Sequence, residues 1–174
     1  IDYFGDGSKL GLNIKYTFHD ENGGTGDAFR TAILESGIKE DNFYAMNGDQ
    51  ITDLDLEGMT NSHINSEAIA TIMTVKLRTS FGLIKINDEN KITEFQEKWI
   101  VPNALINSGI YILNSKIIEY LNGKSIERNT FKKLAEEGKI YSFYYDGVWL
   151  TINDKKELER TEEYLKKFDP LIIY

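Results

Sequence analysis

A short apolar run that ends in a polar turn constrains the fold more than any other feature of the sequence. Residues 43–46, Phe-Tyr-Ala-Met, are continuously apolar, and the run stops at Asn47-Gly48-Asp49. A run of this length between turn residues is typical of a strand buried on both faces, as in parallel sheets. We therefore predict an internal strand with Asp49 at its carboxyl end, where ligands bind in open α/β sheets. An ordinary Asn-Gly-Asp turn is the alternative for the same residues.

The rest of the chain alternates strand and helix patterns at first and pairs strands as a hairpin later. Strand patterns occur at residues 12–16, 43–46, 68–75, 83–86, 91–95, 106–113 and 141–145. Helix patterns follow Gly26 and occur at 117–121 and 158–168. Gly37 is the expected C-cap of the first helix, and Asn153 or Asp154 is the expected N-cap of the last. This order predicts an α/β fold with a mixed, largely parallel sheet flanked by helices, as one domain over residues 1–174.

Composition excludes several classes of partner and site. The 174 residues include 28 acidic and 20 basic side chains, a net charge of −8, which disfavours electrostatic binding to nucleic acid or to an anionic membrane. No apolar run approaches the roughly 20 residues of a membrane span. The absence of cysteine excludes disulfides, cysteine-ligated zinc and thiol nucleophiles, and we interpret the two histidines, His19 and His63, as structural or solvated. These features fit a cytoplasmic protein.

A glycine-rich segment, Gly23-Gly24-Thr25-Gly26-Asp27, opens the first predicted helix. Glycines let backbone N–H groups come close to a ligand, and the amino end of a helix attracts anions. The segment lacks the lysine of a phosphate-binding P-loop and the GxGxxG spacing of a dinucleotide site. It therefore permits two interpretations: a ligand-binding loop, or a tight turn from strand to helix in which Thr25 caps the helix.

Two further segments carry polar residues near predicted strands. Glu97-Lys98 follows the second strand of the hairpin, and Asn107-Ser108-Gly109 lies in the next strand. A lysine ammonium suits a phosphate group, whereas glutamate and asparagine suit sugar hydroxyls. The alternative for Glu97-Lys98 is an ordinary surface pair. Asp53 and Asp55, which follow Asp49 closely, are interpreted as part of a solvated loop and as a helix cap.

The order of these motifs along the chain is more specific than any one of them. The sequence contains, in order, Phe4-Gly5-Asp6-Gly7-Ser8-Lys9-Leu10-Gly11, Gly24-Thr25-Gly26-Asp27-Ala28, Asn47-Gly48-Asp49, Phe81-Gly82, Glu97-Lys98, Asn107-Ser108-Gly109-Ile110-Tyr111 and Trp149-Leu150. In this combination the chain, from Ile1 to about Leu165, resembles the sugar-phosphate nucleotidylyltransferase family, which includes glucose-1-phosphate thymidylyltransferases and mannose-1-phosphate guanylyltransferases. The resemblance implies a nucleotide-diphospho-sugar transferase-like fold, related to the Rossmann fold.

Members of this family join a nucleoside triphosphate to a sugar 1-phosphate and release pyrophosphate, with Mg²⁺ neutralising charge on the phosphates. By this resemblance Asp49 and Lys98 are the catalytic residues. Gly24 and Thr25 would lie along the nucleoside base, and Asp49 would contact the nucleotide as the ligand of Mg²⁺. The sugar phosphate would be held by Gly82, Glu97, Lys98, Asn107 and Trp149.

The sequence also departs from the family pattern. The glycine-rich, arginine-containing segment that holds the triphosphate would precede Ile1, so we expect the chain to be a carboxyl-terminal part that is inactive alone. Thr151 stands where the family has an aspartate as second metal ligand, Trp99 replaces a proline, and Asp27 replaces a glycine of the base loop. These departures leave an alternative open: a non-catalytic relative that binds a nucleotide sugar or a partner protein. The base, the sugar and the oligomeric state, a homo-oligomer included, also stay open.

Overall fold

The computed structural model describes residues 1–20, 22–79, 81–97 and 100–168. Its backbone divides into two compact units. The first unit consists of Ile1–Ala45, Thr60–Thr71 and Ile112–Tyr141, and the second unit consists of Met46–Met59, Ile72–Tyr111 and Ser142–Tyr174. Each unit therefore draws on several separate stretches of the chain.

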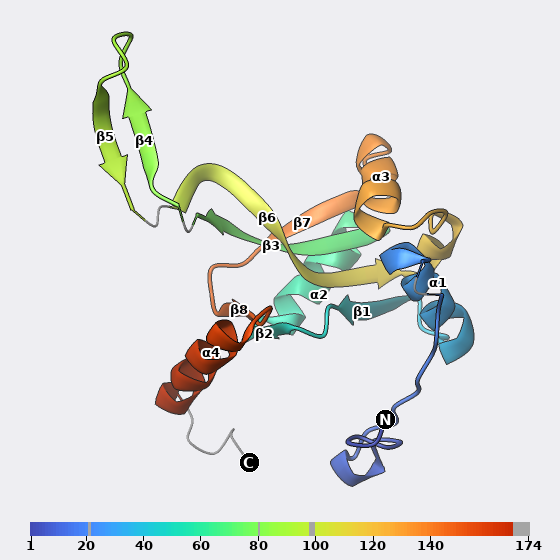
Figure 1. Ribbon diagram of the computed structural model, residues 1–174. Helices are drawn as coiled ribbons and strands as arrows, with labels where there is room; N and C mark the ends of the chain where they lie inside the picture. Colours follow the sequence, from blue (N-terminus) through green and yellow to red (C-terminus); the bar gives the residue numbers. More distant parts are fainter. Residues whose placement is uncertain (21, 80, 98–99, 169–174) are drawn as a thin grey trace. The chain divides into compact units, whose positions relative to one another are not determined.

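The described residues form strands and helices in the order that Figure 1 shows. The strands are β1 (Asn42–Met46), β2 (Gln50–Thr52), β3 (Ala70–Arg78), β4 (Leu83–Ile86), β5 (Ile92–Gln96), β6 (Ile100–Asn114), β7 (Ile140–Tyr144) and β8 (Trp149–Thr151). The α-helices are α1 (Gly24–Ser36), α2 (Leu56–Ser66), α3 (Lys132–Glu136) and α4 (Lys155–Phe168). Turns of 3₁₀ helix occupy Ser8–Leu10 and Ser115–Glu119, and a π-helix occupies Ile126–Phe131. Among these described helices, none combines the length and the apolar character that a membrane crossing requires.

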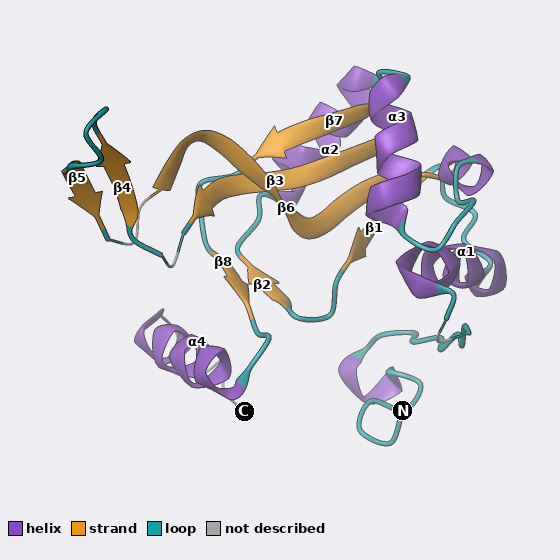
Figure 2. Ribbon diagram, turned by 45° about the horizontal axis from the view of Figure 1, so that its top comes forward, coloured by secondary structure: helices purple, strands orange, loops and turns teal. Residues whose placement is uncertain are grey.

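Four strands form the main sheet, in the order β1-β6-β3-β7. Beyond one end of β1, the Asn47 amide donates to Gly109 O (2.9 Å), and beyond the other end, the Ser115 amide donates to Asp41 O (2.7 Å). These bonds make β1 antiparallel to β6. Strand β6 also runs against β3 (Figure 1), whereas β7 runs with β3 (Figure 2). The predicted mixed sheet flanked by helices is confirmed, and β1, β3 and β7 share one direction.

The prediction that the strand ending at Met46 is internal is wrong. In the sheet that the described residues form, β1 stands at the end of the strand order. Its side chains alternate between exposed and half-buried, and Tyr44 and Met46 are 44% and 52% exposed. The run reads as continuously apolar because tyrosine counts as apolar, although its hydroxyl can face polar surroundings. Here the Tyr44 hydroxyl bonds that of Thr60.

The strand predicted at residues 12–16 is also absent from the described structure, in which these residues have no regular element. Their backbone bonds go to the preceding turn instead. The amides of Leu12 and Ile14 donate to the carbonyls of Gly7 and Asp6 at 3.0 and 2.8 Å. Donors that are used locally in this way cannot form a ladder with another strand. The alternation of apolar and polar residues therefore misled the prediction.

The hairpin predicted at residues 83–86 and 91–95 is confirmed. Strands β4 and β5 pair antiparallel, with Ile84 opposite Phe95. At the turn, Asn87 Oδ1 accepts the amides of Glu89 and Lys91 at 3.0 and 2.9 Å. An asparagine side chain that bonds the backbone a few residues on is a common way to close a turn.

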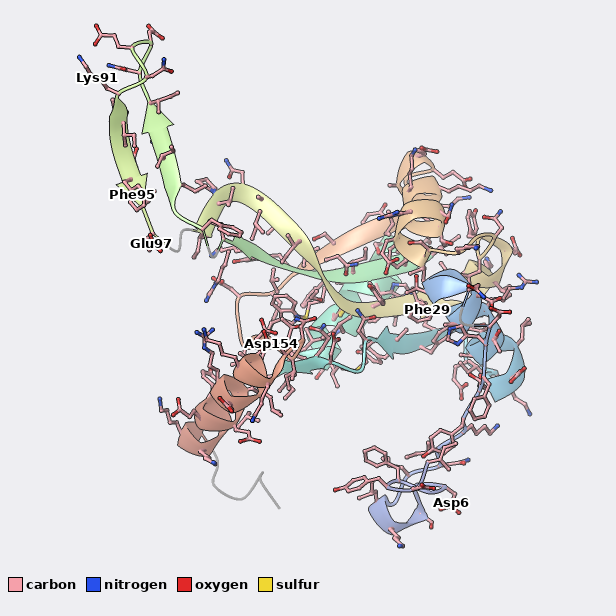
Figure 3. The ribbon with its side chains drawn as sticks, in the orientation of Figure 1. Asp6, Phe29, Lys91, Phe95, Glu97 and Asp154 are labelled. Atoms are coloured by element: carbon pink, nitrogen blue, oxygen red, sulfur yellow. The ribbon has the colours of Figure 1, made fainter. Side chains whose placement is uncertain are left out.

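The predicted helix ends are confirmed where the structure tests them. Gly37 ends α1 with a φ of 69°, in the left-handed region that favours glycine. Asp154 lies at the start of α4 (Figure 3), where its Oδ1 accepts the amide of Glu157 at 2.8 Å. Asp154 is therefore the N-cap of α4. Asn153 is bound to the same first turn, because its own amide donates to the Glu157 carboxylate at 2.8 Å.

Each unit has its own buried apolar residues. Those of the first unit include Leu113, Ile117, Leu121, Ile126, Phe131 and Leu134. Those of the second unit include Met59, Met73, Val75, Ile110 and Tyr111. Strand β6 supplies buried residues to both sets, and its buried stretch begins at Ser108, directly after Asn107. The motif Asn107-Ser108-Gly109 thus lies where β6 passes from exposed to buried surroundings.

Candidate active site

The second unit brings together three of the motifs that the sequence singled out. The turn Asn47-Gly48-Asp49 follows β1, Asn107-Ser108-Gly109 belongs to β6, and residues 149–151 form β8. The Asn47 amide donates to Gly109 O at 2.9 Å, and Trp149 Nε1 donates to Ser108 O at 3.0 Å. The Ile152 amide donates to Asp49 O at 3.0 Å. These bonds tie the Asp49 turn, the Ser108 segment and β8 into one junction.

Glycine is required at position 109 of this junction. Its φ is +84°, and a Cβ built on it would lie 2.7 Å from Asn47 Nδ2. A side chain would therefore be strained by the backbone and would push Asn47 away. At Gly48, by contrast, a Cβ would meet no atom of the described chain within 4 Å. The Asp49 turn is thus tightly packed on the Gly109 side and has open space beside Gly48.

The Asp49 carboxylate is half-buried, and its Oδ1 accepts a hydrogen bond from Gln50 Nε2 at 2.8 Å. The ribbon of β2 and β8 pairs Gln50 with Thr151. Thr151 Oγ1 accepts a hydrogen bond from Asn153 Nδ2 at 2.9 Å. Asp49 and Thr151 are therefore close in the fold, as the resemblance implied for the two positions of a metal site.

These residues fit a magnesium ion that is held partly by its substrate. The described residues contain no group of three or more histidine, cysteine, aspartate or glutamate side chains that could hold a metal ion. Mg²⁺ nevertheless binds through one or two carboxylates when substrate phosphates and water complete its octahedral shell. Asp49 would supply the carboxylate, and the neutral Thr151 hydroxyl adds no charge.

Asn107 and Trp149 are both held in place by local hydrogen bonds. Asn107 Nδ2 donates to the Tyr111 hydroxyl at 3.0 Å, and Asn107 Oδ1 accepts the Gly109 amide at 2.9 Å. These two bonds use one N–H and one lone pair of the Asn107 amide, which has a second of each. The Trp149 N–H donates to Ser108 O, which holds that edge of the indole ring at β6.

A hollow of about 250 Å³ lies beside Trp149 in the second unit. Ile106 and Val75 contribute apolar wall, and Lys76, Arg78 and Asp146 contribute charged groups. Lys76 Nζ and Asp146 Oδ2 form an ion pair at 3.0 Å. The Tyr144 hydroxyl and then Asp146 raise the pKa of Lys76, and Lys76 lowers the pKa of Asp146. The hollow thus combines a fixed indole with an ammonium and a guanidinium.

Gly82 and Glu97 meet at the base of the hairpin. Glu97 lies just beyond the end of β5 (Figure 3). A Cβ built on Gly82 would lie 2.8 Å from Phe95 Cζ and 3.3 Å from Glu97 Oε2. Glycine at position 82 therefore leaves room for the Phe95 ring and the Glu97 carboxylate. Lys98, the residue expected nearest the sugar phosphate, lies outside the described residues, and so does Trp99.

The glycine-rich turn belongs to the first unit and packs against residues 123–127. A Cβ on Gly24 would lie 2.3 Å from Lys124 O, and one on Gly26 would lie 2.2 Å from Gly123 O. The Gly26 amide donates to Lys124 O at 2.9 Å. Close backbone packing therefore accounts for glycine at both positions.

Thr25 does not cap its own helix. The N-cap of α1 is Gly23, which has no side chain. Instead Thr25 Oγ1 accepts the amide of Ile126 and donates to Glu127 Oε2, both at 3.1 Å. Thr25 thus serves the start of the π-helix at Ile126–Phe131, about a hundred positions later.

Asp53 has a role that sequence reasoning missed. Its Oδ1 accepts both the Tyr145 hydroxyl and the Val148 amide, each at 2.7 Å. Burial, with the nearby Asp53 carboxylate, raises the pKa of Tyr145 to about 12. Asp53 therefore anchors the segment that leads to Trp149, although nothing in the local sequence signals this long-range contact. Asp55, expected as a helix cap, is confirmed: its Oδ1 accepts the Gly58 amide at 2.9 Å.

His63 is structural, as the sequence suggested. It is 2% exposed, with Nδ1 at 2.8 Å from Thr71 Oγ1 and Nε2 at 3.0 Å from Asn42 Oδ1. Because Asn42 Oδ1 can only accept, Nε2 carries the proton. Burial lowers the pKa of His63 and favours this neutral form. His19 is exposed.

Comparison with known proteins decides the family. Residues 2–165 match the nucleotidyl transferase family. The chain belongs to the nucleotidyl transferase family. This confirms the resemblance that the order of the motifs indicated.

The curated relatives that the chain matches are named as sugar-phosphate nucleotidyltransferases. The chain is 35% identical to a UTP–glucose-1-phosphate uridylyltransferase of Synechocystis sp., over 86% of this chain and 44% of that protein. It is 34% identical to a mannose-1-phosphate guanyltransferase of Kluyveromyces lactis, over 93% of this chain and 48% of that protein. The chain thus spans about half the length of the curated relatives it matches.

Solved structures confirm the nucleotidyl transferase fold. A putative glucose-1-phosphate thymidylyltransferase from Bacillus anthracis, in complex with a sucrose, matches with a TM-score of 0.67 and 22% identity, over 94% of this chain and 69% of that one. HddC from Yersinia pseudotuberculosis matches with a TM-score of 0.66 and 23% identity, over 95% and 72% of the two chains. The α/β fold expected from the sequence is therefore the fold of these proteins.

Proposed function

We propose that this protein joins a nucleoside triphosphate to a sugar 1-phosphate, giving a nucleotide sugar and pyrophosphate. Family membership supports this reaction class. The observation that carries it is the junction of the Asp49 turn with Ser108-Gly109 and Trp149–Thr151 in the second unit. A non-catalytic relative could bind a nucleotide sugar with the same groups, so turnover is the property that separates the two functions.

In the proposed reaction an oxygen of the sugar phosphate attacks the α-phosphorus of the triphosphate, and pyrophosphate leaves from the opposite side. Such chemistry needs mainly positioning and electrostatic stabilisation from the protein. Mg²⁺, held by Asp49, would neutralise the phosphate charges when bound. Gly24 and Thr25 would lie along the base.

The sugar phosphate would be held by groups of complementary chemistry. Lys98 would supply the positive charge, and the Glu97 carboxylate would accept sugar hydroxyls beside Gly82. Asn107 would use its remaining donor and acceptor, and the fixed Trp149 ring would pack against the sugar. We propose that Glu97, Lys98 and Asn107 line one pocket with Asp49.

We further propose that residues 1–174 belong to one nucleotidyltransferase-like domain, that the protein acts in the cytoplasm, and that it has no nucleic acid or membrane partner. The net charge of −8 supports the last point, since anionic polymers and surfaces repel such a chain. A homo-oligomer is compatible with this proposal.

The test is a pyrophosphate-release assay on the full-length protein, with several nucleoside triphosphates and sugar 1-phosphates. Turnover with one pair above background is the expected result, and it identifies the base and the sugar. A nucleotide sugar that binds with no turnover for any pair would favour the non-catalytic alternative.

A further inference from the structure

Gln50 has an unusual arrangement of hydrogen bonds beside Asp49. Its Nε2 donates to Asp49 Oδ1 at 2.8 Å. Its Oε1 is buried, yet it has no hydrogen-bond partner among the described residues. A buried polar atom without a partner is rare in native proteins, and each instance calls for an explanation.

The chemistry of the two groups fixes the orientation of the Gln50 amide. An ionised carboxylate can only accept hydrogen bonds, so the amide must present its N–H to Asp49. Rotating the amide by 180° would place Oε1 against Asp49 Oδ1, with two acceptors facing each other. The unsatisfied oxygen is therefore a consequence of holding Asp49, and it cannot be removed by exchanging the two ends of the amide.

The neighbouring strand does not supply the missing donor. Gln50 is paired with Thr151 in the β2–β8 ribbon, so their side chains share a face. Thr151 Oγ1 is bonded to Asn153 Nδ2, at 2.9 Å. The next backbone amide, that of Ile152, donates to Asp49 O. The Thr151 hydroxyl is the acceptor in its bond with Asn153, and neither it nor the Ile152 amide bonds Gln50 Oε1 in the described structure.

We infer that Gln50 is a positioning residue of the Asp49 site, with two separate tasks. Its N–H holds the Asp49 carboxylate, and its buried Oε1 accepts a hydrogen bond from what binds there. This inference rests on the proposed function. The group that donates to Gln50 Oε1 is an O–H group. It belongs either to a water bound to the metal ion or to a hydroxyl of the nucleotide.

The experiment compares Gln50→Met with Gln50→Glu in the full-length protein. Methionine keeps the length of the side chain but has no strong donor or acceptor, whereas glutamate restores an oxygen acceptor without the N–H. Gln96→Met is the matched control, because Gln96 is the other glutamine of the chain and is a half-buried strand residue. Two arms separate the sources of the donor: Mn²⁺ alone, followed by electron paramagnetic resonance, and UTP or GTP without metal, followed by calorimetry.

We expect Gln50→Met to lose about tenfold or more in affinity in at least one arm, the size typical of groups that support a metal ligand. Gln96→Met should bind as the wild type does. Loss in the Mn²⁺ arm assigns the donor to metal-bound water, and loss in the nucleotide arm assigns it to a hydroxyl. Partial recovery in Gln50→Glu supports the acceptor task, and no recovery overturns that task.

Thermal unfolding without ligand separates a positioning role from a structural one. Gln50→Met removes an unsatisfied buried oxygen, which stabilises the fold, and one bond to the half-buried Asp49 carboxylate, which water can replace. The midpoint should therefore stay nearly unchanged while binding falls. Wild-type affinity for Gln50→Met in both arms would overturn the inference. Asp49→Asn separates this failure from a failure of the proposed function: if Asp49→Asn also binds Mn²⁺ and nucleotide as the wild type does, or if the wild type binds neither probe, the proposed site itself is wrong.

Discussion

The two glycine-containing turns of this protein differ in how their polar groups are satisfied. In the glycine-rich turn of the first unit, the Gly26 amide and the Thr25 hydroxyl are bonded to residues 124–127. At the Asp49 turn of the second unit, a carboxylate is held by one amide whose oxygen finds no partner within the described chain. The side-chain hydroxyl and the amide of the first turn are satisfied by packing, whereas the second turn leaves one buried oxygen unsatisfied in the described structure.

The largest effect is expected from Asp49→Asn. The change keeps the shape of the side chain and removes the charge that the proposed Mg²⁺ site requires. Activity should fall by about 10³-fold, or roughly 4 kcal/mol of transition-state stabilisation. Pyrophosphate release by the full-length protein measures it. Turnover close to that of the wild type would show that the Asp49 turn has no catalytic role and does not differ from the glycine-rich turn in this respect.

Gly26→Ala should strongly destabilise the glycine-rich turn. The new methyl group would lie 2.2 Å from Gly123 O, a backbone atom that cannot move aside cheaply. We expect a loss of about 2–3 kcal/mol in the free energy of unfolding, measured by urea denaturation.

Gly48→Ala is the matched control for Gly26→Ala in the Asp49 turn. A Cβ there meets no atom of the described chain within 4 Å, so the free energy of unfolding should stay unchanged. Equal destabilisation by both changes would show that the Asp49 turn is packed as closely as the glycine-rich turn.

Thr25→Val tests whether the glycine-rich turn serves the π-helix. Valine has nearly the same shape but cannot accept the Ile126 amide, so a hydrogen bond at the start of the π-helix is lost, while the N-cap Ser125 stays. The free energy of unfolding should decrease by about 1 kcal/mol. Thr25→Ser, which keeps the hydroxyl, should recover most of it. If Thr25→Val instead weakens nucleotide binding with no change in stability, the hydroxyl belongs to the ligand site.

The smallest expected effect is the change in the free energy of unfolding in mild acid. Burial lowers the pKa of His63, so in mild acid the unfolded chain binds a proton that the folded chain does not. The free energy of unfolding should therefore decrease as the pH falls below about 6.5 towards the lowered pKa. Thermal midpoints between pH 8 and 5 would measure this, and His63→Gln should flatten the slope. An unchanged slope would mean that other groups control the acid response.

Local features of this fold were predictable from the sequence. The β4–β5 hairpin and the Asp154 and Gly37 caps each depend on neighbours within a few residues, so turn and cap chemistry was enough to find them. The order of the motifs gave the family, and with it the closeness of Asp49 and Thr151.

The remaining features depend on contacts between distant parts of the chain. Three such features are the close packing of Gly26 against Gly123, the bond between the Ile126 amide and Thr25, and the pairing of β1 at the end of the sheet. Each involves partners far away in sequence. No periodicity encodes such partners. The prediction that β1 is internal was wrong for the same reason. It relied on the apolar run at residues 43–46, but whether a tyrosine is buried depends on what packs against it.

Asp53 holds two positions of the second unit in place and leaves a short exposed segment between them. Asp53 fixes Tyr145 and Val148, and Asp146 and Gly147 lie between these two anchored positions. Asp146 is exposed, and its ion pair with Lys76 lies at the surface, where such pairs contribute little to stability. A Cβ on Gly147 would lie 2.4 Å from both Cζ and the hydroxyl of Tyr145, so glycine is required there. Substitutions at Asp146 can therefore remodel the hollow while Trp149 keeps its place. Position 146 is therefore the natural place for a small library that varies the lining of this hollow and leaves its Trp149 wall in place.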